Sequence, residues 1–441
     1  QDGNVGNDPR GTAAYLDMLG ANAFGSYRQL LEGVSTSPMM GMYLTFRGNQ
    51  KADPRTGRTP DENYGREVMQ LMSIGLHELN IDGTEKMESG APIDTYGPAD
   101  VANMAMVFTG WSWACPDWPD NGCFFNGSAN GNSDTGRSIK PMLGYPQYHS
   151  VEAKSFLGLS LSAEAPADPK ASMKSALDAL TEHPNVAPFI ARQLIQRLVT
   201  SNPSPGYVAS VASAFNGNAD GDLKAAIKAI LMHPEARAVG PTSGKLREPV
   251  LKLSAFLRAF SFTSDTGNYA VGNTDSAGSQ LGQTPMRSPS VFNFFRPGYV
   301  PPGGVAESAG LTMPELQIAN ETSASGYVNY MRDNVASGIG AYNGTVNGTV
   351  FNRRDLQADY SGELAAAADA AALVARMNDK LLYGQMPGSL GMLIQGAVEK
   401  IAIPALSSTG SNRAAVDSAK RARVNAAVFL TLASPEYQTQ K

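Results

Sequence analysis

The chain has 441 residues, of which 42% are hydrophobic and 17% are charged, and its formal net charge is −5. This apolar fraction is ordinary for a globular protein and excludes wholesale disorder. A mild negative charge argues against nucleic acid as a main partner, because phosphate binding relies on clustered positive charge. The length predicts two or three domains, and no run approaches the ~20 apolar residues that span a bilayer.

Helical periodicity dominates the sequence. In chain order, amphipathic runs predict helices over 24–34, 59–75, 98–109, 172–182, 186–200, 205–215, 222–232, 245–260, 363–383 and 414–433. The clearest start combines Thr59 as N-cap, Pro60 at the first helical position and Glu62 three residues after the cap. Strand-like alternation is scarce. The predicted fold is therefore all-α, an irregular multi-helix bundle with long loops rich in Gly, Asn and Pro and with little or no strand.

Two loop-rich stretches, residues 110–160 and 262–312, interrupt the helices. We therefore expect three regions. Residues 1–160 hold N-terminal helices and a Trp/Cys-rich loop region, 161–261 form a central helical bundle, and 262–441 hold a loop-rich segment and a C-terminal helical region. The aromatic side chains of the loops either pin them to a small satellite core or offer stacking faces for sugars or peptides.

Cys115 and Cys123 are the only cysteines, and they bracket a short segment dense in Pro, Asn and Gly. Such a segment folds back far enough to bring two Cβ atoms together. The pair therefore favours a disulfide and an oxidising compartment, which predicts a periplasmic or extracellular location. Two free surface thiols in a cytosolic protein are the alternative.

A candidate calcium loop separates two predicted helices. Its oxygen donors alternate along the chain: Asn216, Asn218, Asp220 and Asp222. With Gly221 in the sixth position, the segment matches the first half of an EF-hand loop. The twelfth position, however, is Ile227 where a bidentate Glu belongs, and Asp222 also suits the N-cap of the next helix. Bound Ca²⁺ is one hypothesis, and a plain polar turn is the other.

The candidates for a catalytic site are seven charged or titratable residues: Glu62, Arg66, Glu67, His149, Lys154, Arg247 and Glu248. Paired carboxylates near a histidine perform acid–base chemistry or hold a divalent cation. The structural alternative is a capping box at Glu62 with Arg66 at ion-pair spacing, and a packed ion pair at Arg247 and Glu248. Zincin, Gly-x-Ser-x-Gly and P-loop signatures are absent, so enzymatic activity stays open and a non-enzymatic role is favoured.

Several short motifs follow one another in a fixed order: Glu62-Asn63-Tyr64-Gly65-Arg66-Glu67, Phe108-Thr109-Gly110-Trp111, His183-Pro184-Asn185, Lys245-Leu246-Arg247-Glu248-Pro249, Ser290-Val291-Phe292-Asn293 and Ser434-Pro435-Glu436-Tyr437. This order resembles the bacterial family labelled domain of unknown function 1800, from about residue 25 to the C-terminus. The resemblance implies a helix-rich, commonly exported protein, encoded beside a second exported family with a sulfatase-like fold. That second protein is a candidate partner. The resemblance implies no reaction.

This sequence departs from the family pattern in three places. Family members begin with a further helical region that holds a Trp-His-Asn-His-like segment, so we expect this chain to be the C-terminal part of a longer precursor or a processed product. Gln70 stands where members usually have Glu, and Ser150 stands where they usually have Asp after the histidine. Chemistry that depends on either acid in relatives is in doubt here.

These observations predict an exported helical protein that acts as a binding or assembly component of a periplasmic or extracellular complex. A protein partner is expected, formation of an oligomer stays open, and neither nucleic acid nor a transmembrane segment is expected. The residues establish no cofactor, and Ca²⁺ is the candidate. One alternative is a hydrolase-type enzyme acting on extracellular polymer through a carboxylate/His site with a divalent cation. It requires Glu67 and His149 within hydrogen-bond or metal-ligand reach of each other. Another is a subunit of an extracellular filament or a peripheral subunit of a membrane complex.

Overall fold

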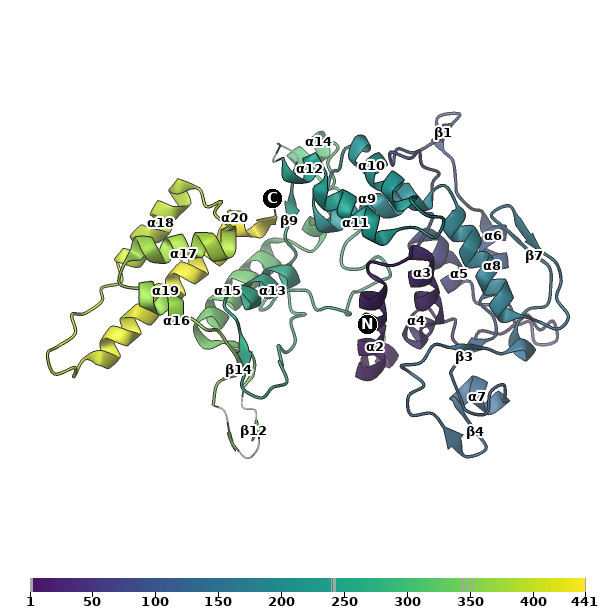
Figure 1. Ribbon diagram of the computed structural model, residues 1–441, viewed down its shortest axis with the longest axis horizontal. Coiled ribbons are helices and arrows are strands. Elements are labelled where there is room, and N and C mark those ends of the chain that lie inside the picture. Colours follow the sequence, from purple (N-terminus) through teal and green to yellow (C-terminus); the bar gives the residue numbers. More distant parts are fainter. Residues whose placement is uncertain are drawn as a thin grey trace. The chain divides into compact units, whose positions relative to one another are not determined.

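The computed structural model describes residues 3–440 except 239, 241–242, 343–344, 347–348 and 351. The chain forms two compact units, Gln1–Ser243 and Gly244–Lys441 (Figure 1). About 48% of the structure is helical and 10% is strand, so the predicted dominance of helices is confirmed. The boundaries predicted near residues 160 and 261 stay a prediction. Within the described residues, no helix has both the length and the apolar character needed to cross a membrane.

The N-terminal unit is built mainly from helices: α1 (Gly3–Gly6), α2 (Pro9–Asn22), α3 (Tyr27–Thr36), α4 (Pro38–Tyr43), α5 (Asn63–Gln70), α6 (Pro98–Val107), α7 (Asn121–Asn126), η1 (Pro146–Tyr148), α8 (Pro169–Glu182), α9 (Val186–Leu198), α10 (Pro205–Phe215), α11 (Leu223–Met232) and α12 (Pro234–Arg237). Polar N-caps fix several of the starts. The side chains of Ser26, Asp168, Ser204 and Asp222 each accept a hydrogen bond from a backbone N–H in the first turn.

One predicted helix start is wrong. Helix α5 begins at Asn63, and Thr59 and Pro60 lie before it, so the expected capping box is not formed. The reason is local: Asp61, held by Asn49, accepts the backbone N–H of Asn63 at 2.8 Å and takes the capping role. Helix α5 then packs closely against α6, where a Cβ on Gly65 would lie 3.0 Å from the backbone nitrogen of Ala105.

The strands of the N-terminal unit are two or three residues long and form antiparallel pairs: β1 (Met87–Glu88) with β2 (Ala91–Pro92), β3 (Trp111–Ser112) with β6 (Leu143–Gly144), β4 (Ser128–Ala129) with β5 (Asn132–Ser133), and β7 (Lys154–Phe156) with β8 (Leu159–Leu161). These pairs are a departure from the expectation of little or no strand. Each is too short for an alternating pattern to emerge from the sequence. Most of them lie in the loop-rich stretch over 110–160, which they fold into a compact layer.

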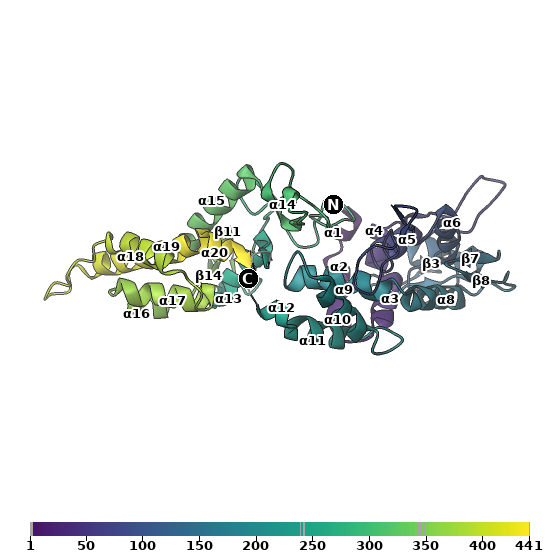
Figure 2. The same cartoon turned by 90° about the horizontal axis from the view of Figure 1, so that it is seen from above.

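The C-terminal unit has its own helices: α13 (Pro249–Ala259), α14 (Val305–Ser308), η2 (Pro314–Gln317), α15 (Glu321–Ser337), α16 (Ser361–Ala366), α17 (Ala370–Leu382), α18 (Gly388–Glu399), α19 (Arg413–Ala433) and α20 (Pro435–Gln438). Its strands are β9 (Lys245–Leu246), β10 (Thr263–Ser264), β11 (Ile339–Tyr342), β12 (Thr345–Val346), β13 (Thr349–Val350), β14 (Arg354–Gln357) and β15 (Thr439–Gln440). Helices α17, α18 and α19 pack together (Figure 2). Their core includes the fully buried Met377, Ile394 and Val428.

Candidate functional site

Glu62 and Glu67, the two carboxylates predicted on the helix over 59–75, have different surroundings in the structure. Glu62 is half exposed and forms an ion pair with Arg66 at 3.0 Å. Glu67 is 8% exposed, and its Oε2 is buried with no hydrogen-bond partner among the described residues. Burial raises the pKa of Glu67, and the charge of Arg66 offsets this in part. Glu62 and Arg66 therefore form a surface pair, and Glu67 alone has an environment unusual for a carboxylate.

His149 is fully buried and takes its partners from distant segments of the N-terminal unit. Its Nδ1 lies 2.8 Å from the carbonyl oxygen of Thr109, which follows α6, and its Nε2 lies 3.0 Å from the hydroxyl of Ser172 on α8. Ser172 Oγ also lies 2.8 Å from Glu164 Oε1, and its single proton serves either this carboxylate or Nε2. Burial lowers the pKa of His149, and this outweighs the opposing effects of the Thr109 carbonyl and Glu164. The ring is therefore neutral near pH 7.

The His149 cluster (His149, Thr109, Ser172 and Glu164) differs from a catalytic triad in the order of its bonds. In a triad, the acid holds Nδ1 of the histidine and the serine meets Nε2. Here Nδ1 donates to a backbone carbonyl, and the acid contacts the serine instead. Ser172 is also only 1% exposed, so a substrate cannot reach its hydroxyl. The cluster fastens η1 and α8 to the end of α6.

The structure does not bring His149 and Glu67 into contact. The polar contacts of the His149 side chain in the described chain are with Thr109, Ser172 and Glu164. Within the same described residues, no three His, Cys, Asp or Glu side chains are placed to hold a metal ion. The contact on which the enzyme alternative depends is therefore not formed.

Lys154 closes the loop after His149. Its ammonium group is almost fully buried and donates to the carbonyl oxygens of Ser150 at 3.0 Å and Glu152 at 3.3 Å. Burial lowers the pKa of Lys154, with Glu164 and Glu152 acting in the opposite direction. The two carbonyl oxygens of its own loop satisfy the buried ammonium group, so the burial of Lys154 does not require a catalytic role.

Arg247 and Glu248 belong to the C-terminal unit, whereas the other five catalytic candidates belong to the N-terminal unit. The Arg247 guanidinium lies 4.7 Å from the ring centroid of Tyr437. Glu248 is 1% exposed and accepts a hydrogen bond from Gln283 at 2.7 Å. Next to them, Lys245 and Glu315 form a buried ion pair at 2.8 Å. These contacts pack the start of α13 within its own unit.

The candidate calcium loop forms a polar turn between α10 and α11. Asp222 caps α11 by accepting the N–H of Ala225 at 2.8 Å. Asn218 accepts the N–H of Asp220 at 3.0 Å, and Asn216 is the residue at which α10 ends. The side chains of Asn218 and Asp222 thus already serve the backbone. Calcium binding by this loop stays a hypothesis.

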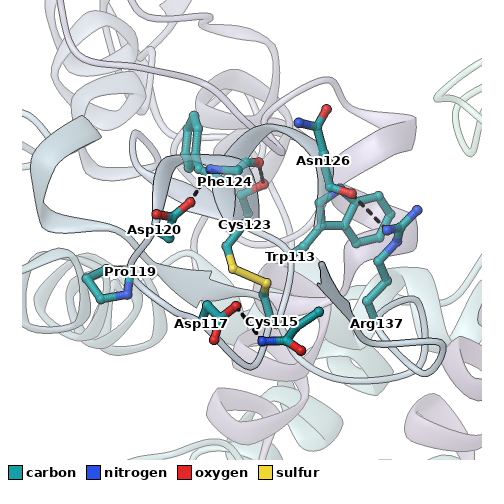
Figure 3. The surroundings of a disulfide bond; sticks show 12 residues. Trp113, Cys115, Asp117, Pro119, Asp120, Cys123, Phe124, Asn126 and Arg137 are labelled. Carbon is teal, nitrogen blue, oxygen red and sulfur yellow. Dashed lines mark hydrogen bonds between the residues drawn. A yellow bond between two sulfur atoms is a disulfide. The ribbon is translucent and has the colours of Figure 1, made fainter. Parts of the chain in front are cut away.

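Cys115 and Cys123 form a disulfide, with their Cα atoms 5.5 Å apart. Helix α7 carries Cys123 and Phe124, which lie next to each other in Figure 3. Phe124 packs against Tyr145, so that the disulfide and these two rings form a small buried cluster. The interpretation of this loop as anchored to a satellite core is therefore confirmed. Trp118, at the rim, is 44% exposed.

A pocket of about 490 Å³ lies beside this cluster, between the start of α2, the end of α4 and the segment after β5. We call it the Trp113 pocket. Its wall combines an indole, a guanidinium, two carboxylates, an amide, three hydroxyls and a thioether: Trp113, Arg137, Asp8, Asp134, Asn7, Ser133, Thr135, Ser138 and Met42. One aromatic face surrounded by convergent polar groups is typical of a site for a polar organic ligand.

Two arginines contact the indole of Trp113. The guanidinium carbon of Arg47 lies 4.4 Å from the ring centroid, and that of Arg137 lies 5.1 Å from it. Arg137 also donates to the carbonyl oxygen of Asn126 at 2.7 Å, as Figure 3 shows. Gly127, which ends α7 with φ +67°, permits this approach, because a Cβ there would lie 2.6 Å from Cδ of Arg137.

The carboxylates of the pocket wall have hydrogen-bond or ion-pair partners in the chain, whereas the two arginines on Trp113 form no ion pair within the described residues. Burial, and then the nearby charge of Arg137, lowers the pKa of Arg47. In the described part of the chain, neither arginine forms an ion pair with a carboxylate. Both wall carboxylates have other partners, since Asp134 binds Lys140 and the N–H of Gly136, and Asp8 accepts the N–H of Gly11.

Comparison with protein families gives one finding. The sequence matches the family described as protein of unknown function (DUF1800) over residues 2–439. The chain belongs to this family. The resemblance inferred from the short motifs is confirmed, and the match covers nearly the whole chain. Comparison with curated proteins and with solved structures gives no match.

For this member of the DUF1800 family, sequence reasoning missed the arginines of the Trp113 pocket. Trp113 and the Gly-rich segment that holds Arg137 were both placed in a loop-rich stretch with aromatic stacking faces, which is the signal that pointed nearest to the pocket. Nothing in the sequence linked them to Arg47, which comes 66 residues before Trp113. The contact between these residues forms only in the folded chain, where β3 pairs with β6 within the stretch over 110–160.

Proposed function

We propose that this protein is a binding component that acts outside the cytoplasm and takes a polar, hydroxyl-bearing ligand in the Trp113 pocket. The observation that carries the proposal is the pocket itself, about 490 Å³ in volume, with an indole and a guanidinium among hydroxyl, amide and carboxylate groups. These are donors and acceptors that pair with the hydroxyl groups of a saccharide.

The chemistry of the wall suits binding better than catalysis. Asp134 has a lowered pKa, because Lys140 and the N–H of Gly136 donate to it, so it is an ionised acceptor and a poor general acid. His149, the one fully buried histidine of the unit, is engaged by Thr109 and Ser172 outside the pocket. The wall therefore offers fixed hydrogen-bonding groups without a group poised to exchange a proton.

The proposed location rests on the disulfide. A disulfide between neighbouring cysteines persists in oxidising compartments, which supports a periplasmic or extracellular site of action. A protein partner, including the exported protein with a sulfatase-like fold that the resemblance implies, stays a prediction. The hydrolase and filament alternatives stay predictions as well.

A pocket-filling variant tests the proposal. Thr135 is an exposed residue of the pocket wall, so Thr135→Trp fills the pocket without disturbing a core. Thr56→Trp, at an exposed loop position outside the wall, is the matched control. We expect isothermal titration with neutral and acidic oligosaccharides to find a ligand that binds the wild type and Thr56→Trp, and that binds Thr135→Trp at least about tenfold more weakly.

Two outcomes contradict the proposal. One is the absence of binding by every oligosaccharide in the panel. The other is a Thr135→Trp variant that binds as tightly as the wild type, which would place the binding surface elsewhere on the chain.

A further inference from the structure

The charge balance of the Trp113 pocket narrows the class of ligand. We infer that the pocket selects acidic saccharides, whose anionic group pairs with the guanidinium group of Arg137 on the pocket wall. This inference rests on the proposed function and adds to it the chemical class of the ligand.

The first step concerns the two guanidinium groups. Arg47 and Arg137 lie over one indole and repel each other, which is unfavourable unless an anion stands between or beside them. The Nε of Arg47 is buried and has no hydrogen-bond partner among the described residues. Arg137 uses Nη1 on the Asn126 carbonyl and donates to no carboxylate in the same part of the chain. Arg137 thus has unused hydrogen-bonding capacity at the pocket wall, and neither arginine forms an ion pair within the described residues.

The second step concerns the carboxylates that stand close by. Asp134 is occupied by Lys140 and by the N–H of Gly136, and it thereby shapes the segment that carries Arg137. Asp8 accepts the N–H of Gly11 and caps α2. Both acids are hydrogen-bonded to the backbone or paired with a lysine, so neither forms an ion pair with Arg47 or Arg137 within the described residues.

The third step concerns the shape of the ligand. A guanidinium presents a planar fork of N–H donors that matches a carboxylate better than a neutral acceptor. Ser133, Thr135 and Ser138 add hydroxyl groups along the same wall, which is suited to a ligand with several hydroxyls. Anionic and polyhydroxylated character combine in a sugar acid.

The two arginines have different roles in this arrangement. Arg137 lines the pocket, so it is the group that contacts the anion. Arg47 lies on Trp113 outside the wall, so it acts as a positioning residue that holds the indole and adds positive charge near it. Loss of Arg137 therefore removes the preference for an acid, and loss of Arg47 weakens it.

The test compares a sugar acid with its uncharged ester. Tetragalacturonate and its fully methyl-esterified form present the same sugar rings with and without charge. We expect isothermal titration at pH 7 to show that the wild type binds the free acid at least about tenfold more tightly than the ester. The preference should shrink as salt is added, because exposed charges are screened.

Variants assign the preference to Arg137. We expect Arg137→Met to bind acid and ester with equal affinity. Arg55→Met is the matched control, since the Arg55 side chain is 91% exposed on a loop that does not line the pocket, and it should keep the preference. Because Arg137 also braces the loop, Thr135→Glu and Thr135→Gln form a second pair at an exposed position. The glutamate variant should bind the acid about tenfold more weakly than the glutamine variant does.

The outcomes separate the inference from the proposed function. Equal wild-type affinity for acid and ester overturns the inference and leaves the binding function intact. A preference for the acid that survives in Arg137→Met overturns it as well, as does equal binding of the acid by Thr135→Glu and Thr135→Gln. Failure of both galacturonate ligands, in a chain that binds a neutral oligosaccharide, also overturns the inference. Failure of every saccharide overturns both proposals.

Discussion

The His149 cluster and the Trp113 pocket both lie in the N-terminal unit, yet their polar groups differ in whether the chain itself supplies their partners. In the cluster, the ring nitrogens of His149 and the hydroxyl of Ser172 all have partners from the chain itself. In the pocket, the guanidinium groups on Trp113 lack a carboxylate partner among the described residues. A saturated polar cluster holds elements together, whereas an unsaturated one is available to a ligand.

The largest expected effect comes from breaking the saturated cluster. His149→Ala removes a fully buried ring and leaves the Thr109 carbonyl and the Ser172 hydroxyl without this partner. We expect the free energy of unfolding of the N-terminal unit to fall by about 3 kcal/mol, as measured by urea unfolding. His183→Ala is the control, because His183 is only partly buried and should cost about 1 kcal/mol or less. Equal losses in the free energy of unfolding of the two variants would show that the His149 cluster stabilises the unit no more than a partly buried histidine does.

The next largest effect comes from removing the Cys115–Cys123 disulfide, which lies beside the pocket. Replacing Cys115 and Cys123 together by Ala releases a loop whose ends are 8 residues apart in sequence. The loop entropy predicts a loss of about 2 kcal/mol in the free energy of unfolding. Wild-type protein treated with a reductant should show the same loss in the same urea experiment. An unchanged unfolding curve in the double variant would refute the role of the disulfide in stability.

We expect the free energy of unfolding of the N-terminal unit to fall at low pH because His149 becomes protonated. Because the folded protein holds the pKa of His149 below its ordinary value of 6.5, the unfolded chain binds this proton more readily. The contribution of the neutral ring is therefore complete above pH 6.5 and is lost as the pH falls through the lowered pKa. Lys154, Glu164 and Asp168 are the charged groups that act on the ring. Glu164 also has a lowered pKa, since hydrogen bonds outweigh its burial, and it adds a loss of the same sign below pH 4.5.

Urea midpoints measured between pH 8 and pH 5 check this expectation. The wild type should lose stability in that interval, and His149→Gln, which has no titrating ring, should lose less. Parallel curves for the two proteins would mean that His149 does not titrate differently on unfolding.

The smallest effect concerns Glu67, a polar group that neither the cluster nor the pocket uses. Its buried Oε2 lacks a partner in the described chain, and burial raises its pKa, so ionisation near pH 7 disfavours the folded state. Glu67→Gln should raise the free energy of unfolding at pH 7 by less than about 1 kcal/mol, with no gain at a pH low enough to protonate the acid. Loss of stability in the glutamine variant at pH 7 would instead indicate a stabilising role for the charge.

Local signals in the sequence predicted much of the fold. Asp222 caps a helix that begins at Leu223 as expected, and the short segment between Cys115 and Cys123 closes as a disulfide. The start of α5 was misplaced because Asp61 competes with Thr59 for the capping role, and that outcome depends on Asn49, a residue of another segment. Short strands such as β3 and β6 escaped prediction because pairing, and not pattern, creates them.

The candidate site was less predictable for the same physical reason. His149 stood out as a chemical group, but its role depends on Thr109 and Ser172, which lie 40 residues before it and 23 residues after it. Arg47 and Arg137 are 90 residues apart, and only the fold places both on Trp113. Sequence spacing reports on helix faces and turns, whereas these sites are assembled from loops.

The position of Arg137 in the pocket wall depends on the absence of a side chain at Gly127. Any side chain at this position would collide with the stem of Arg137 and would also have to adopt a left-handed backbone, so one methyl group suffices to displace the arginine from the indole. We expect a Gly127→Ala protein to keep its disulfide and helices and to bind the proposed ligand more weakly. Such a variant would be a useful negative control in experiments that isolate a ligand from the native environment, because it measures nonspecific adsorption.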